Sequence, residues 1–151
     1  MSQLTRIAAL LEEIGAEHDF DGRVLVAAVP CEARGALQVG IFLTGRVAIL
    51  QAFVMRAPDR DREGVYARVL AKHLQPHVWR FAIDDTGDLF VVAVLPVDQL
   101  SAAVLEEALA AVSLLVDATY EGLVRTGFDV PDDVVIVGDP PWARDDGSGQ
   151  V

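Results

Sequence analysis

The sequence has 151 residues, of which 52% are hydrophobic, so its length fits one domain and its composition can supply a core. It carries 23 acidic and 12 basic residues, for a formal net charge of −11. Such a charge repels nucleic-acid phosphates and anionic lipids, so we expect no direct nucleic acid binding and no membrane partner. The single cysteine, Cys31, excludes a disulfide within the chain and is compatible with a cytoplasmic protein. No secretion signal is expected, because acidic residues interrupt the apolar residues near the N-terminus.

The first half of the chain predicts one helix followed by three strands. Apolar residues at helical spacing predict an amphipathic helix over residues 3–15. Residues 16–22 are polar and acidic and are expected to form a connector. Segments rich in β-forming residues follow, separated by Pro30 and by the turn glycine Gly45, which predicts an antiparallel meander. Its strands are expected at residues 23–29, 36–43 and 46–55.

The second half predicts a helix, a hairpin and a long helix. Val65, Val69 and Leu74 mark a second helix that ends before Pro76. Two strands follow, and the loop 84–88 joins them as a hairpin. The expected segments are strands at residues 78–83 and 89–95 and a helix at residues 102–125. The order α-β-β-β-α-β-β-α predicts an α+β fold, a five-stranded antiparallel sheet with helices packed on one face.

The chain is expected to divide into a domain at residues 1–127 and a tail at residues 128–151. The tail is acidic and ends in glycine and serine, so we expect it to be partly disordered. Its apolar stretch Val134–Val137 and its Trp142 are exceptions to the polar composition. Trp142 gains little unless it docks, either on the chain's own sheet, on a dimer mate, or on a partner.

Two of the expected strands are apolar on both faces. In residues 46–55 one face carries Ile49 and Phe53 while the other carries Leu50 and Val54, and residues 89–95 follow the same pattern. An antiparallel sheet with one solvated face should alternate apolar and polar residues. A second copy, a client protein or the chain's own tail is therefore expected to cover part of the second face, unless its small residues leave only a modest patch. The candidate interface residues are Ile49, Phe53, Phe90, Val92, Val94 and Trp142.

The organisation resembles the YbjN family over residues 3–126. The resemblance rests on the order of the elements and on one segment of the sequence. That segment runs from Trp79-Arg80-Phe81 through Asp84-Asp85-Thr86-Gly87-Asp88-Leu89 to Leu95-Pro96, and continues with Leu100-Ser101 and the long helix that holds Asp117 and Tyr120. The resemblance implies the fold of the type III secretion chaperones and a homodimer with a curved antiparallel sheet. It also implies a role in stress response or regulation without enzymatic activity; nothing in the sequence indicates a secretion apparatus.

Residues that could hold a metal are sparse. His73 and His77 are four residues apart, but Pro76 lies between them and no third ligand is near in sequence, so we interpret them as surface or helix-end residues. The aspartates of the loop 84–88 resemble part of a calcium loop. The position six residues after Gly87 is alanine, however, where an EF-hand needs glutamate, so we expect a hairpin turn.

Residues that could catalyse a reaction are also sparse. Cys31 follows a proline and has no histidine beside it in sequence to activate it, so we interpret it as a structural cysteine. The sequence holds no nucleophile-elbow, phosphate-loop or dinucleotide-binding motif. Trp79 and Phe81 share a strand face with Ile83, and we expect that face to belong to the core beneath the helices.

These observations predict a non-enzymatic, chaperone-like module that binds another protein, with no cofactor and with a homodimer as its expected state. The alternative is a regulatory domain that senses a small molecule between sheet and helices. An enzyme would need a cavity lined by converging polar groups.

Overall fold

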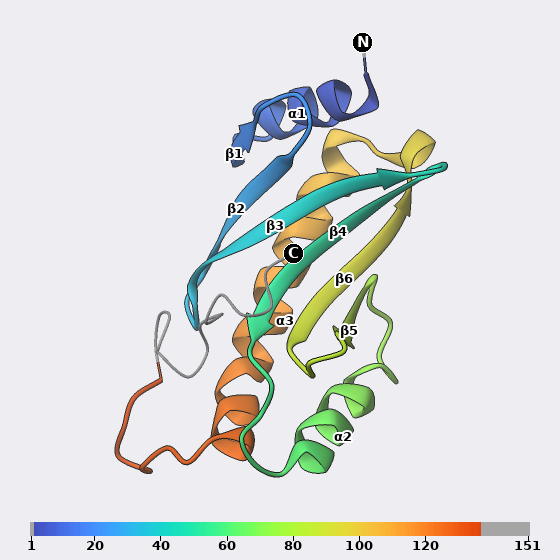
Figure 1. Cartoon of the computed structure of the whole chain (residues 1–151). Coiled ribbons are helices and arrows are strands. Elements are labelled where there is room, and N and C mark those ends of the chain that lie inside the picture. Colours follow the sequence, from blue (N-terminus) through green and yellow to red (C-terminus); the bar gives the residue numbers. More distant parts are fainter. Residues whose placement is uncertain (1, 137–151) are drawn as a thin grey trace.

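A computed structural model of the chain describes residues 2–136 (Figure 1). It has an antiparallel sheet and three α-helices, which confirms the α+β class. The helices are α1 (Gln3–Glu13), α2 (Arg62–Lys72) and α3 (Ala102–Gly127), with a short 3-10 helix η1 (Val97–Gln99) before α3. The strands are β1 (Glu17–Phe20), β2 (Leu25–Cys31), β3 (Gly35–Thr44), β4 (Val47–Met55), β5 (Trp79–Ile83) and β6 (Leu89–Pro96).

The sheet has six strands in the order β1-β2-β3-β4-β6-β5, so the prediction of five was wrong. The missed strand is β1, in the segment expected to be a connector. β1 is a four-residue edge strand in which Glu17 and Asp19 are exposed while His18 and Phe20 are partly buried. An edge strand of this length needs few apolar residues, and its polar sequence therefore concealed it.

Turn chemistry fixes two of the hairpins that the sequence predicts. Gly45 has φ of 57° in the two-residue connection between β3 and β4, where Thr44 pairs with Val47. Glycine adopts this left-handed conformation without the steric cost that other residues meet. In the β5–β6 loop the Asp84 carboxylate accepts hydrogen bonds from the backbone N–H groups of Thr86 and Asp88, both at 3.0 Å. The hairpin interpretation of this loop is confirmed.

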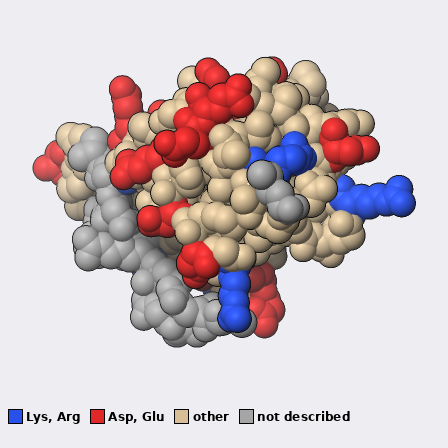
Figure 2. All heavy atoms as spheres, turned by 90° about the horizontal axis from the view of Figure 1, so that it is seen from above, with Lys and Arg blue, Asp and Glu red and all other residues tan. Residues whose placement is uncertain are grey.

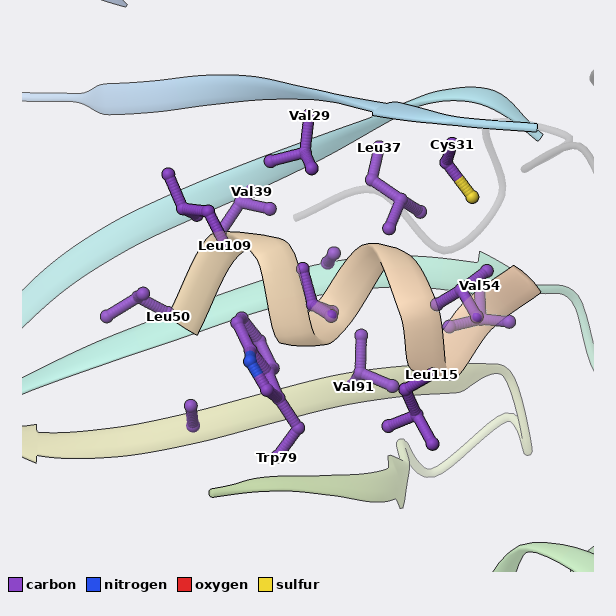
Figure 3. Close-up of a cluster of buried hydrophobic side chains, with 14 of the residues drawn as sticks. Val29, Cys31, Leu37, Val39, Leu50, Val54, Trp79, Val91, Leu109 and Leu115 are labelled. Atoms are coloured by element: carbon purple, nitrogen blue, oxygen red, sulfur yellow. The ribbon is translucent and has the colours of Figure 1, made fainter. Parts of the chain in front are cut away.

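Helix α3 covers one face of the sheet and the core lies between them (Figures 1 and 3). In Figure 3, Trp79, Leu50 and Val91 on the strands lie next to Leu109 and Leu115 on α3. Residues at helical spacing along α3 form a buried stripe that faces the sheet. These are Leu105, Leu109, Val112, Val116, Thr119 and Leu123.

The two shorter helices pack near opposite ends of α3 (Figure 1). The Arg6 guanidinium of α1 donates to the carbonyl oxygens of Val97 and Leu100, at 2.6 and 3.1 Å, and so links α1 to the chain that enters α3. Helix α2 buries Val65 and Val69. Leu74, expected to mark the same apolar stripe, instead follows the end of α2 and is 91% exposed.

The chain remains packed for a few residues after α3. Phe128, Val130 and Ile136 are buried, and the Arg56 guanidinium lies 4.6 Å from the centre of the Phe128 ring. Residues 137–151, most of the predicted tail, lie outside the described residues, so its expected disorder stays a prediction. Between residues 2 and 136, no helix has both the length and the apolar character needed to cross a bilayer.

Candidate functional site

The face of the sheet opposite α3 is the candidate site. Strand register alternates side chains between the two faces, and on β2, β3, β4 and β6 those pointing towards α3 are almost all buried. On the opposite face, here called the open face, no residue of these strands is buried. No helix or strand of the described part covers it (Figure 1). The open face therefore presents side chains to solvent or to another molecule.

A row of three apolar side chains crosses the open face near the β3–β4 hairpin. Phe42 on β3 pairs with Ile49 on β4, which pairs with Val94 on β6. Phe42 is 50% exposed and Val94 is 53% exposed, while Ile49 between them is partly buried. Large apolar side chains that meet on adjacent strands form a contiguous patch rather than scattered surface residues.

A second apolar row lies towards the other end of the same strands. Phe53 on β4 pairs with Phe90 on β6, and their rings meet edge to face with centroids 5.7 Å apart. Ala82 on β5 extends the row beside Phe90. The Arg34 guanidinium, in the turn between β2 and β3, lies 5.6 Å from the centre of the Phe53 ring. The two rings therefore pack edge to face on the open face, and the Arg34 cation lies near the Phe53 ring.

Between the two rows the open face is mildly polar. Gln51, Val92 and Arg80 lie side by side on β4, β6 and β5. The Arg80 guanidinium donates to the carbonyl oxygens of His77 and Trp79, at 2.5 and 3.0 Å. None of the outward positions of β3, β4, β5 and β6 holds an acidic residue, although the whole chain carries 23 of them.

Acidic side chains gather elsewhere on the surface. Figure 2 views the end of the molecule where α1 lies, and red acidic groups predominate there over blue basic groups. The β3–β6 part of the open face therefore differs from this end of the molecule by its apolar side chains and its lack of acidic residues, whereas Glu17 and Asp19 are exposed on the same face of the sheet at its β1 edge.

Five of the six predicted interface residues share this face: Ile49, Phe53, Phe90, Val92 and Val94. Sequence reasoning missed Phe42, the more exposed neighbour of Ile49, although its spacing in the strand after Gly40 and Gln38 could have indicated it. Trp142, the sixth predicted residue, lies outside the described residues. That any of them contacts a partner stays a prediction.

Trp79 lies on the core face, as the sequence predicts. Its side chain is fully buried, and its indole Nε1–H donates to the carbonyl oxygen of Ala108 on α3 at 2.8 Å. Phe81 is partly buried and Ile83 is 52% exposed, so the core face becomes exposed towards the end of β5.

Cys31 is buried and its thiol donates to the Asp117 carboxylate at 3.1 Å. Burial, and then this hydrogen bond, raises the pKa of Cys31 to about 11. Although desolvation opposes the change, hydrogen bonds from the Ala33 N–H and the Cys31 thiol hold the pKa of Asp117 below its ordinary value. A thiol with a raised pKa is a poor nucleophile, which agrees with the structural interpretation of Cys31.

His73 serves a structural purpose at the end of α2. Its Nε2 accepts a hydrogen bond from the backbone N–H of Phe81 at 3.0 Å, and the two rings lie 5.9 Å apart. Desolvation, and then the positive charge of Arg80, lowers the pKa of His73. Nowhere in residues 2–136 do three His, Cys, Asp or Glu side chains come together as a metal site would require.

Comparisons with known proteins identify the family of the chain and a solved structure with a similar fold. A family described as "Putative bacterial sensory transduction regulator" matches residues 3–125. The chain belongs to the YbjN family. The crystal structure of YbjN from E. coli, titled "a putative transcription regulator", superposes with a TM-score of 0.58 at 14% identity, covering 79% of this chain and 92% of that one. At this identity the likeness shows the fold alone.

Among curated relatives, the chain is similar to "Uncharacterized protein Mb0497" of Mycobacterium bovis and "Uncharacterized protein Rv0487" of Mycobacterium tuberculosis. Each is 25% identical over 104 residues, covering 69% of this chain. The chain spans 57% of the length of these relatives. The description of the matching family is that of a regulator rather than an enzyme. The fold of the secretion chaperones stays a prediction.

Proposed function

We propose that this member of the YbjN family is a non-enzymatic regulatory adaptor whose open face binds another protein. The observation that supports the proposal is the row Phe42–Ile49–Val94, half exposed on a face that no described helix or strand covers. Small-molecule sites are concave and enclose most of their ligand. The open face is instead a broad sheet surface with aromatic and β-branched side chains, a composition suited to a protein interface.

The charge pattern favours a different protein over a second copy as the occupant. Each chain carries a formal net charge of −11, so two copies repel one another as they approach. The open face bears Arg80 and no acidic residue at the outward positions of its β3–β6 strands. A partner with apolar side chains and a carboxylate near Arg80 would complement this face, and charge complementarity would speed and orient its association.

The experiment compares two double variants in affinity capture from a lysate of the source bacterium. F42S/V94S removes apolar contacts from the open face, whereas L70S/L74S removes two exposed leucines from α2 and the segment after it, at 67% and 91% exposure. We expect a protein captured by the wild type to be lost with F42S/V94S and retained with L70S/L74S. Equal capture by the two variants would contradict the proposal.

Light scattering of the purified protein at low micromolar concentration tests whether a second copy of the chain, rather than a different protein, occupies the open face. A wild-type dimer that becomes a monomer in F42S/V94S would assign the open face to a second copy and overturn the adaptor proposal. A state of association that both variants share with the wild type leaves the open face available to the partner, as the proposal requires.

A further inference from the structure

A groove lies at the β2 edge of the sheet, away from the two apolar rows of the open face, between the end of α1, strand β2 and helix α3. Its volume is about 670 Å³, within the range of about 300–1,000 Å³ that binding pockets occupy. Its walls include Ile14, Val29, Pro30, Ala110 and Leu114. Leu114 is 72% exposed on the α3 side of the groove. The groove therefore leaves apolar side chains accessible to a binding partner.

The groove runs beside the end of β2, where no described strand pairs with that edge of β2. β1 pairs with β2 only as far as Glu17 opposite Ala28, and the rest of β2 has no strand on that side (Figure 1). Pro30 has no N–H to offer, and its carbonyl oxygen already accepts a hydrogen bond from the Ser113 hydroxyl at 2.7 Å. An added strand would find no donor at this position and would have to share the carbonyl oxygen with the Ser113 hydroxyl. This edge is therefore poorly suited to strand pairing, and side-chain contacts are the better way to hold an occupant here.

A helix can be held in this way because its backbone hydrogen bonds are internal. Ala110 lies exposed on the α3 wall, and its small side chain allows another helix to approach closely. An amphipathic helix places apolar side chains at spacings of three and four residues, which suits a groove with apolar walls on two sides.

Two carboxylates set the charge that the occupant must carry. Glu17 on β1 and Glu106 on α3 both line the groove, and both are exposed. Neither forms an ion pair with another side chain of residues 2–136. Basic residues flanking the apolar side of the occupant would pair with them, and they would also be attracted by the acidic protein as a whole.

We propose that this groove binds an amphipathic helix of a partner protein, with apolar side chains between β2 and α3 and with Lys or Arg residues against Glu17 and Glu106. This site is separate from the apolar rows of the open face and does not rest on the adaptor proposal. The substitutions that probe the groove share no residue with those that probe the open face, and only the control position Leu74 is common to both, so the failure of either proposal can be recognised on its own.

The probe is a fluorescent Leu/Lys peptide of about 18 residues, long enough for roughly five helical turns. Two matched peptides accompany it: a Leu/Glu version of the same pattern, and the Leu/Lys peptide with a central proline that breaks the helix. Binding to the full chain is measured by fluorescence anisotropy at about 0.15 M salt, where exposed charges more than about 8 Å apart are largely screened. We expect the Leu/Lys peptide to bind, and the Leu/Glu and proline peptides to bind at least about tenfold more weakly.

Protein variants locate the binding. E17K/E106K should weaken the Leu/Lys peptide by about tenfold, whereas E63K/D85K, which changes the net charge equally at other exposed positions, should weaken it by less than about threefold. L114S should weaken binding while L74S, at another exposed leucine, should not. Equal effects in the paired variants would show a nonspecific charge attraction and overturn the proposal. So would unchanged binding of the proline peptide, or amide chemical shifts that move around Phe42 and Phe90 instead of around Ala28 and Ala110.

Discussion

Trp79→Phe tests whether α3 is held on the sheet as described. The indole of Trp79 is fully buried and donates to the Ala108 carbonyl at 2.8 Å. Losing this hydrogen bond costs about 0.5–1.5 kcal/mol, because the carbonyl also belongs to the helix and keeps its backbone donor. The smaller ring leaves a cavity of roughly 40 Å³, worth about 1 kcal/mol at about 24 cal/mol per Å³. The free energy of unfolding should therefore fall by about 1.5–2.5 kcal/mol.

Urea denaturation followed by far-ultraviolet circular dichroism measures this loss without relying on tryptophan fluorescence. In thermal unfolding followed by the same signal, the melting temperature should fall by about 3–10 °C, since about 2–4 °C corresponds to 1 kcal/mol in a chain of this size. The control is Val94→Thr, which keeps a branched side chain at a position 53% exposed on the open face and should cost less than about 0.5 kcal/mol. A Trp79→Phe protein as stable as the wild type, or a Val94→Thr protein as weakened as Trp79→Phe, would refute the assignment of the two faces.

Three further predictions concern stability. Because the pKa of Cys31 is raised from 9.0 to about 11, the folded protein keeps a proton that the unfolded chain releases, so the free energy of unfolding should fall as the pH rises from about 9 to about 11. Cys31→Ala should flatten that fall in denaturation curves taken across the same pH window, and an unchanged fall would refute the assignment to this thiol. Gly45→Val should cost about 1–2 kcal/mol in urea denaturation, since φ of 57° strains a branched residue, and Gly45→Asn should cost less; equal losses would contradict the turn geometry. Gly127→Ala should cost about 1–3 kcal/mol in thermal unfolding, because a Cβ there would lie 2.9 Å from the Cβ of Pro58, and an unaffected melting temperature would show that the contact relaxes.

The sequence predicts the long, strongly periodic elements of the fold well. The stripe on α3 and the hairpin at Gly45 follow from helical spacing and from turn chemistry, which are local properties of the chain. β1 escaped prediction because a short edge strand takes its stability from pairing with β2 rather than from its own residues. Leu74 was misplaced because helical spacing alone does not say where a helix ends.

The candidate site was predictable in part. Apolar residues on both faces of β4 and β6 indicate a surface without a helix over it, and the structure places Ile49, Phe53 and Phe90 together there. The groove beside β2 could not be predicted, since its walls come from segments far apart in the chain, with Ile14 on one side and Leu114 on the other. Such a surface depends on the packing of α1 and α3 against the sheet, which no local pattern specifies.

Site-specific photo-crosslinking tests the central claim, that the open face binds another protein, most directly. A photoreactive phenylalanine analogue replaces Phe42 in one variant and Leu74 in a control, two residues that are both exposed but lie on different surfaces. After irradiation of cells, the Phe42 variant is predicted to form an adduct with a distinct second protein, identified by mass spectrometry, that the Leu74 variant does not form. The claim would be contradicted by the same adducts from both positions, by no adduct from Phe42, or by adducts from Phe42 that contain only a second copy of this chain.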